Sequence, residues 1–171
     1  MQSQLIIDNQ SVAAQSGATF SRVHPSTGEV VTHAAAGGVA DAVAAANSAQ
    51  AAFQSWRHSA PSERRRLLNK AADVLDSMTP KFIEAMGAEV GASGLWAGFN
   101  VFLAANVFRE AASMVTQIQG ETIPTDKPGA LSMTVRQPVG VILSIVQWNG
   151  PVVLAARAIA YPIACGNTVV F

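Results

Sequence analysis

The sequence predicts an α/β protein whose C-terminal part begins a doubly wound, Rossmann-like parallel sheet. Residues 139–146 are nearly all apolar and rich in β-branched side chains, the pattern of a strand buried on both faces of a parallel sheet. A helix-compatible segment, 151–164, follows, and a Gly166–Asn167 turn then leads into a second extended run, 168–171. The order strand, helix, strand predicts a right-handed parallel crossover.

Composition argues against several kinds of partner. Half of the 171 residues are hydrophobic, 13% are charged, and 11 basic residues balance 11 acidic ones, which does not favour binding to nucleic acid. The single cysteine, Cys165, rules out an internal disulfide framework. Three scattered histidines (His24, His33 and His58) offer no metal-ligand spacing, so no metal site is expected.

The chain shows no targeting or membrane pattern. Its N-terminus has no basic region followed by an apolar core. The longest apolar runs, 139–146 and 152–165, are interrupted by arginine, proline or glycine before the ~20 residues that a membrane helix requires. We therefore expect a cytoplasmic protein without a membrane partner.

Residues 1–38 predict a region of β-hairpins. Three extended runs, Gln4–Asn9, Thr19–His24 and Glu29–Ala34, contain the expected strands. The turn residues Pro25–Gly28 separate the last two runs.

Residues 39–120 predict a helical region. Apolar residues at helical spacing indicate helices over 39–56, from Pro61 to about residue 78, from Thr79 to 87–91, and over 95–118. Pro61 suits a first helical position, and Thr79 suits an N-cap. Trp96, Phe99 and Leu103 lie on one face of the last helix, which favours a place in the core.

The run Arg64–Arg66 is open to two interpretations. Three arginines can form an anion site, but on an amphipathic helix they are expected to form its solvated side.

Residues 121–138 predict a connection followed by a strand over Leu131–Gln137, and 139–171 begin the parallel sheet. One or two parallel strands cannot bury both of their faces. We therefore expect the natural chain to continue beyond Phe171, and we expect these residues expressed alone to aggregate or to be partly molten.

The loop after residue 146 is the place to expect a ligand, because ligands of open α/β sheets bind at the carboxyl ends of the strands. Its neutral Asn149 amide can donate a hydrogen bond to a developing oxyanion. The alternative is that Asn149 only caps the helix that begins at Pro151.

Several ordered motifs together resemble the N-terminal portion of the aldehyde dehydrogenase superfamily. The resemblance covers essentially the whole chain through His24–Val30, Ala52–Phe53 with Trp56, Glu63–Leu68, Arg136–Val141, Trp148–Asn149 and Ala164–Val170. It implies that Asn149 donates to the oxyanion of a cysteine thiohemiacetal. It also implies that Ile145, Val146, Gln147 and Trp148 run along a nicotinamide cofactor, and that residues 39–120 are the helical part of the cofactor-binding domain.

The same resemblance implies what these residues lack. In the family the cysteine nucleophile, the general-base glutamate and a ribose-binding lysine all follow the position of Phe171, so the isolated segment is expected to be inactive. The cofactor is expected to be NAD, with NADP as the alternative. Cys165 aligns with a small residue, ends an apolar helix, and is expected to be a buried structural thiol rather than the nucleophile.

Three residues suggest an aromatic substrate. Gly150 stands where the superfamily commonly has a large aromatic residue, which is expected to widen the pocket. Arg157, two helical turns later, can donate to a ring hydroxyl or can form a structural salt bridge. Trp96 can stack on an aromatic ring or belong to the core.

These features resemble bacterial family members that oxidise salicylaldehyde, vanillin or benzaldehyde. Two alternatives stay open: an aliphatic or semialdehyde dehydrogenase, and a non-catalytic oligomerisation module. The Leu131–Gln137 strand resembles the arm through which such subunits associate, so a homodimer or homotetramer is expected.

Overall fold

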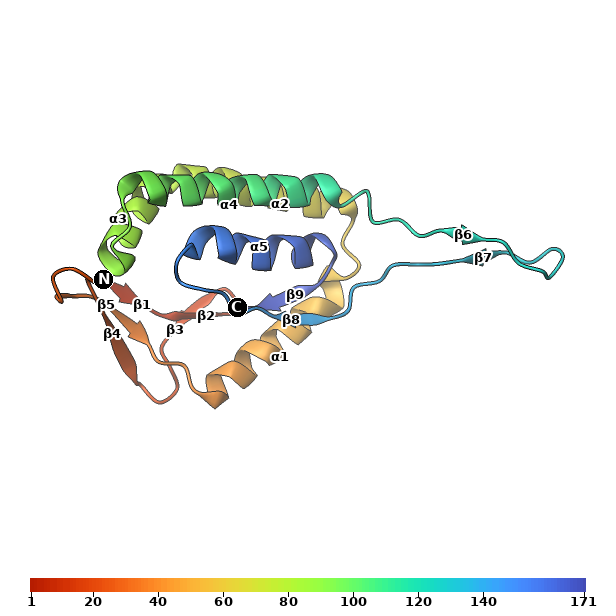
Figure 1. The fold of residues 1–171 in the computed structure, drawn as a ribbon. Helices are drawn as coiled ribbons and strands as arrows, with labels where there is room; N and C mark the ends of the chain where they lie inside the picture. The colour runs from red at the N-terminus through yellow and green to blue at the C-terminus, as the bar shows by residue number, and fades with distance from the viewer.

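The computed structural model describes all residues from Met1 to Phe171 as five helices and nine short strands (Figure 1). The helices are α1 (Val39–Trp56), α2 (Pro61–Ser77), α3 (Thr79–Val90), α4 (Gly94–Met114) and α5 (Pro151–Ala164). The strands are β1 (Gln2–Ser3), β2 (Leu5–Ile7), β3 (Gln10–Val12), β4 (Thr19–Val23), β5 (Val30–Ala35), β6 (Thr122–Ile123), β7 (Ser132–Met133), β8 (Val141–Leu143) and β9 (Thr168–Val170). None of the five helices combines the length and hydropathy that crossing a membrane requires.

The N-terminal region is built from two hairpins, as predicted. β4 pairs antiparallel with β5, and β1 adds to the other edge of β5 in parallel. The prediction of one extended run over Gln4–Asn9 is wrong, because Asp8 and Asn9 adopt left-handed conformations with φ of 53° and 57°. Asp and Asn tolerate this region, so they form the tight turn that joins β2 to the unpredicted strand β3.

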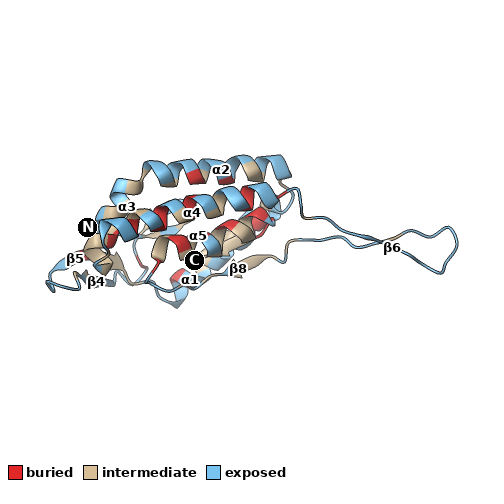
Figure 2. Cartoon of the chain, turned by 45° about the horizontal axis from the view of Figure 1, so that its top comes forward, coloured by how far each residue is buried: buried red, intermediate tan, exposed pale blue.

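Helices α2, α4 and α5 form the core of the molecule. In Figure 1, α2 and α4 lie side by side and α5 lies beneath them, and Figure 2 shows the buried positions on their facing sides. The central cluster consists of Leu68, Ala111, Ala112, Val115, Ala160 and Ala164. Because most of these side chains are alanine, the helix axes can approach closely.

The predicted parallel connection of strand, helix and strand is confirmed. β8 and β9 pair in parallel, with Val141 opposite Thr168, and α5 connects them. The buried Asn167 fixes this unit, since its Oδ1 accepts from the amides of Val139 and Gly140 at 2.8 and 3.1 Å. The prediction of a strand buried on both faces over 139–146 is wrong for this chain. β8 has one partner strand, and Leu143 is 69% exposed.

The segment between α4 and β8 forms an arm that projects from the body (Figure 1). The predicted strand over Leu131–Gln137 shrinks to β7, which pairs with β6 inside the predicted connection. Two residue pairs form the whole ladder, and no helix or sheet covers either face.

The helix predictions hold with local corrections. Met78 rather than Thr79 is the N-cap of α3, and the last predicted helix ends at Met114 rather than at residue 118. The solvated-face prediction for the arginine run is wrong for two of its members. Arg64 and Arg65 are half-buried, and Arg65 donates to the Ala112 carbonyl and to Thr116 because this side of α2 packs on α4.

Candidate functional site

The loop from Ile145 to Asn149 leaves the carboxyl end of β8 and leads into α5. Ile145 is 86% exposed and Trp148 is 71% exposed, while Val146 is half-buried and Gln147 is exposed. The loop after the parallel strand thus presents two exposed apolar side chains, Ile145 and Trp148. In an α/β sheet this is the edge at which a ligand binds.

Asn149 is exposed, and its side chain makes no hydrogen bond within the chain. The capping alternative is wrong, because the N-cap of α5 is Gly150, with Pro151 at the first helical position. No side chain caps this helix end. The Asn149 amide is therefore free to donate to a bound group beside the positive end of the helix dipole.

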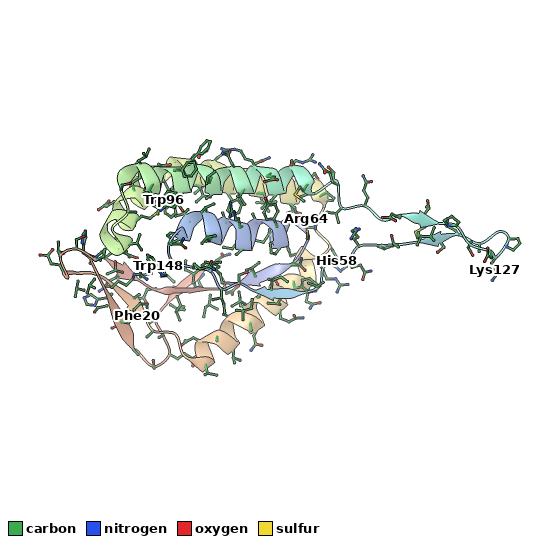
Figure 3. All side chains as sticks on the ribbon, viewed as in Figure 1. Phe20, His58, Arg64, Trp96, Lys127 and Trp148 are labelled. Carbon is green, nitrogen blue, oxygen red and sulfur yellow. The ribbon has the colours of Figure 1, made fainter.

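Trp96 is brought against this loop by α4. Its Nε1 donates to the Asn149 carbonyl oxygen at 3.3 Å, and Figure 3 places the Trp96 and Trp148 labels at the same end of the helical layer. The core alternative for this face is wrong for the aromatic residues, since Trp96 is 44% exposed and Phe99 is 46% exposed. Their rings contact one another at a centroid distance of 5.9 Å. The pair forms a partly open aromatic surface next to Asn149.

Gly150 is buried between α4 and α5. An ideal Cβ at this position would lie 3.3 Å from Asn100 Oδ1 and 3.4 Å from Val153 Cγ1. Both distances are at or inside the lower limit of ordinary contact. The first carbon of a larger residue would therefore press on the helix interface and not enter open space.

Arg157 lies on α5 two turns after Gly150 and is exposed. It forms no ion pair within the chain, so the salt-bridge alternative has no partner among these residues. Its charge acts on Tyr161, one turn further along α5. The pKa of Tyr161 is raised by burial and by its hydrogen bond to the Glu110 carboxylate, while Arg157 opposes the rise. Arg157 keeps its donors available.

Sequence reasoning missed Asn100, which lies one turn after Trp96 on α4. It is completely buried and faces Gly150. The sequence pattern that could have identified Asn100 is a single amide on an otherwise apolar helix face, among Ala97, Val101 and Ala104.

The prediction that the Cys165 thiol is buried is wrong, because Cys165 is exposed. It is the C-cap of α5, one residue beyond the buried stripe that ends at Ala164, so its side chain leaves the helix interface.

A large cavity lies away from this loop. About 850 Å³ in volume, it is lined by residues of β2, α1, the end of α5 and β9. Asp8 is the one ionisable side chain in its lining, and neither Asn149 nor Trp96 belongs to it. The loop after β8 is nevertheless the better candidate, because it carries the exposed Asn149 amide and contacts the half-exposed Trp96 ring.

A parallel β–α–β crossover with an accessible loop at the carboxyl end of its first strand is typical of an α/β protein of the Rossmann-like class. Comparison with known proteins narrows this class. Residues 12–171 match the aldehyde dehydrogenase family, and the chain belongs to that family.

Three relatives illustrate the match. The chain is 56% identical to the vanillin dehydrogenase of Pseudomonas fluorescens, with 97% of the chain and 34% of the relative aligned. It superposes on the crystal structure of a salicylaldehyde dehydrogenase from Pseudomonas putida G7 complexed with salicylaldehyde, with a TM-score of 0.98 and 64% identity over 100% of the chain and 35% of that structure. It also superposes on PnpE from Pseudomonas sp. WBC-3 in complex with nicotinamide adenine dinucleotide, with a TM-score of 0.95 and 34% identity over 99% and 35%. The chain thus spans about 35% of the length of the relatives that it matches.

Proposed function

We propose that the full-length protein containing this segment oxidises an aromatic aldehyde, such as salicylaldehyde, to the carboxylic acid with a nicotinamide cofactor. The observation that carries the proposal is the free Asn149 amide at the carboxyl end of β8, in a chain 64% identical to a salicylaldehyde dehydrogenase. These residues supply part of the site, and the family resemblance assigns the cysteine nucleophile and the glutamate base to the remainder of the protein.

Asn149 is proposed as an oxyanion donor. When a thiolate adds to the aldehyde carbon, the carbonyl π electrons move onto oxygen, and an amide N–H directed at that oxygen stabilises the negative charge. Asn149 suits this task because its side chain is exposed and has no competing partner, and because Trp96 holds its backbone carbonyl. A neutral amide also stays a donor at every working pH.

The segment Ile145–Trp148 is proposed to hold the nicotinamide cofactor, which when bound accepts the hydride of the aldehyde carbon. The residues fit a flat, partly apolar group, since Ile145 and Trp148 expose most of their surface at the sheet edge and Gln147 adds an exposed amide. The likeness to a structure complexed with NAD supports this cofactor.

Trp96, Gly150 and Arg157 are proposed to shape the substrate pocket. Trp96 offers a half-exposed ring against the Asn149 loop, and Arg157 offers an exposed guanidinium without an acidic partner. A ring for stacking and a fork of donors suit an aromatic aldehyde that carries a hydroxyl group. Gly150 contributes by lacking a Cβ, which would press on Asn100 Oδ1 and displace the loop that carries Asn149.

The test of the donor role is Asn149→Ala in the full-length enzyme, with the exposed Asn69→Ala on α2 as the matched control. We expect kcat to fall by about 10²–10³-fold, because removal of one oxyanion donor has this effect. The control is expected to keep its kcat. Steady-state oxidation of salicylaldehyde measures both, and an Asn149→Ala enzyme with undiminished kcat contradicts the proposal.

The test of the pocket is Arg157→Met, with Arg66→Met on the exposed side of α2 as the control. We expect the ratio of kcat/KM for salicylaldehyde to kcat/KM for benzaldehyde to fall about tenfold or more, because a hydrogen bond to a charged group contributes roughly 1.5–3 kcal/mol. An unchanged ratio means that Arg157 does not recognise the ring hydroxyl.

The arm formed by β6 and β7 is proposed to join subunits of a homo-oligomer. Its apolar side chains are left uncovered: Ile123, Leu131, Met133 and Val135 are each between 45% and 73% exposed. Light scattering of the full-length protein tests this. Met133→Asp together with Val135→Asp is expected to lower the particle mass to that of one subunit, and an unchanged mass contradicts the assignment.

A further inference from the structure

Asn100 is a fully buried polar residue in the middle of α4. Its Nδ2 donates to the Trp96 carbonyl oxygen at 3.2 Å, one turn back along the helix. Its Oδ1 is buried and has no hydrogen-bond partner within the chain. A buried amide oxygen without a donor is unfavourable. An amide kept at such a position on an alanine-rich face therefore calls for a role beyond packing.

The oxygen of Asn100 faces the start of α5. It would lie 3.3 Å from a Cβ on Gly150, the N-cap residue of that helix. Gly150 has no side chain to accept from the first turn, and Pro151 has no N–H. The carbonyl dipole of Asn100 thus lies against the positive end of α5, at a place where the loop supplies no side-chain acceptor.

Two residues of α4, one helical turn apart, contact two consecutive residues of the loop, Asn149 and Gly150. Trp96 Nε1 holds the carbonyl of Asn149 at 3.3 Å, and Asn100, one turn later, packs on Gly150. The Asn149 side chain makes no hydrogen bond of its own. The direction of its amide therefore depends on how α4 places the Asn149–Gly150 peptide.

We propose that Asn100 is a positioning residue for Asn149, and that its Oδ1 restricts position 150 to glycine. Trp96 fixes one end of the Asn149–Gly150 turn and Asn100 fixes the other. The inference rests on the donor role proposed above for Asn149 and adds the residue that orients the donor. It requires the fit between positions 100 and 150 to control turnover and not only stability.

The experiment is a double-mutant cycle in the full-length enzyme with Gly150→Ala, Asn100→Ala and both changes together. Asn100→Leu tests loss of the polar atoms at similar size, and Asn106→Leu, at an exposed asparagine on the same helix, is the matched control. Each enzyme is measured for kcat and KM with salicylaldehyde, normalised to folded protein, and for its thermal unfolding midpoint.

We expect Gly150→Ala to lower kcat about tenfold in the parent enzyme, because a displacement of a fraction of an ångström at a reacting group is costly. In the Asn100→Ala background the same change is expected to lower kcat less than about twofold, because the new Cβ no longer meets Oδ1. Asn100→Leu is expected to lower kcat about tenfold with KM within about twofold, and Asn106→Leu to change neither.

Equal losses of kcat from Gly150→Ala in both backgrounds overturn the inference. So does an Asn100→Leu enzyme that unfolds at a lower temperature but keeps the parent kcat, since a merely structural residue behaves in that way. Asn149→Ala distinguishes failure of the donor role of Asn149 from failure of the positioning role of Asn100. If that enzyme keeps its kcat, the donor role fails and the inference fails with it. If it loses activity while the cycle shows no coupling, only the role of Asn100 fails.

Discussion

All residues of the arm from 121 to 131 are exposed, whereas four alanines of α4, at positions 104, 105, 111 and 112, are at most 1% exposed. The helical layer buries its side chains against α2 and α5 within one chain. The arm has two paired residues in each strand and nothing against either face. The helical layer therefore contributes most of the free energy of unfolding, whereas the apolar side chains of the arm stay uncovered within the chain.

The largest contrast is expected from truncating one leucine in each region. Leu68→Ala removes a side chain that is 3% exposed at the centre of the core cluster, and we expect a loss of about 2–5 kcal/mol in the free energy of unfolding. Leu131→Ala on the arm, at a residue 73% exposed, is expected to change it by less than about 0.5 kcal/mol. Urea unfolding of the full-length protein, followed by circular dichroism, measures both. Equal midpoints for the two variants contradict the contrast.

Two glycines sharpen the comparison, because both have left-handed φ. Gly166 follows the C-cap of α5 with φ of 83°, and a Cβ there would lie 2.6 Å from Arg64 Nη1 and 2.8 Å from Pro138 Cγ. Gly129 on the arm has φ of 74° and open space around it. Gly166→Ala is expected to cost about 1–3 kcal/mol more than Gly129→Ala, since the backbone strain is shared and only the contacts differ. The difference between the two unfolding free energies is the measurement, and a value near zero means that Arg64 and Pro138 move aside freely.

A smaller effect is expected from the bond between α4 and α5. Burial and the hydrogen bond to Glu110 raise the pKa of Tyr161 above its ordinary 10.0. The folded state thus holds this proton more tightly than the unfolded state. The resulting stabilisation is present below the unfolded pKa and is lost as the pH rises through the folded one. Above about pH 10 the wild type is expected to lose stability more steeply than Tyr161→Phe. Parallel pH profiles for the two proteins argue against this bond.

The smallest effect is expected at the surface of the layer. Arg109 Nη2 pairs with Asp76 at 2.6 Å and with Asp73 at 3.2 Å, yet its side chain is 41% exposed. Arg109→Met is expected to lower the free energy of unfolding by only about 0.2–1 kcal/mol, because solvent screens exposed pairs. The difference should shrink in 1 M salt. A loss that is larger and insensitive to salt indicates packing by the arginine stem.

Local sequence patterns were sufficient for the helices and the crossover. The bounds of α1 and α5 follow from apolar spacing, from the glycines before α1 and from Pro151, because these signals act within a few residues of one another. The same patterns misplaced the aromatic residues of α4. A helical stripe says that Trp96 and Phe99 share a side of the helix, but it does not say whether another element covers that side.

Asn149 shows how far prediction from the sequence reaches and what only the tertiary structure adds. Its residue type and its place after a β-branched run suggested a donor at a strand end, and the family resemblance strengthened that interpretation. The structure shows that Gly150, and not Asn149, is the helix cap. It also shows that Trp96 donates to the Asn149 carbonyl and that Asn100 faces Gly150, two contacts between residues about 50 positions apart. The sequence by itself determined the helices, the crossover and the candidate donor, because periodicity and turn chemistry are local. Only the tertiary structure decided which buried side chains surround that donor, because packing between distant helices leaves no local pattern in the chain.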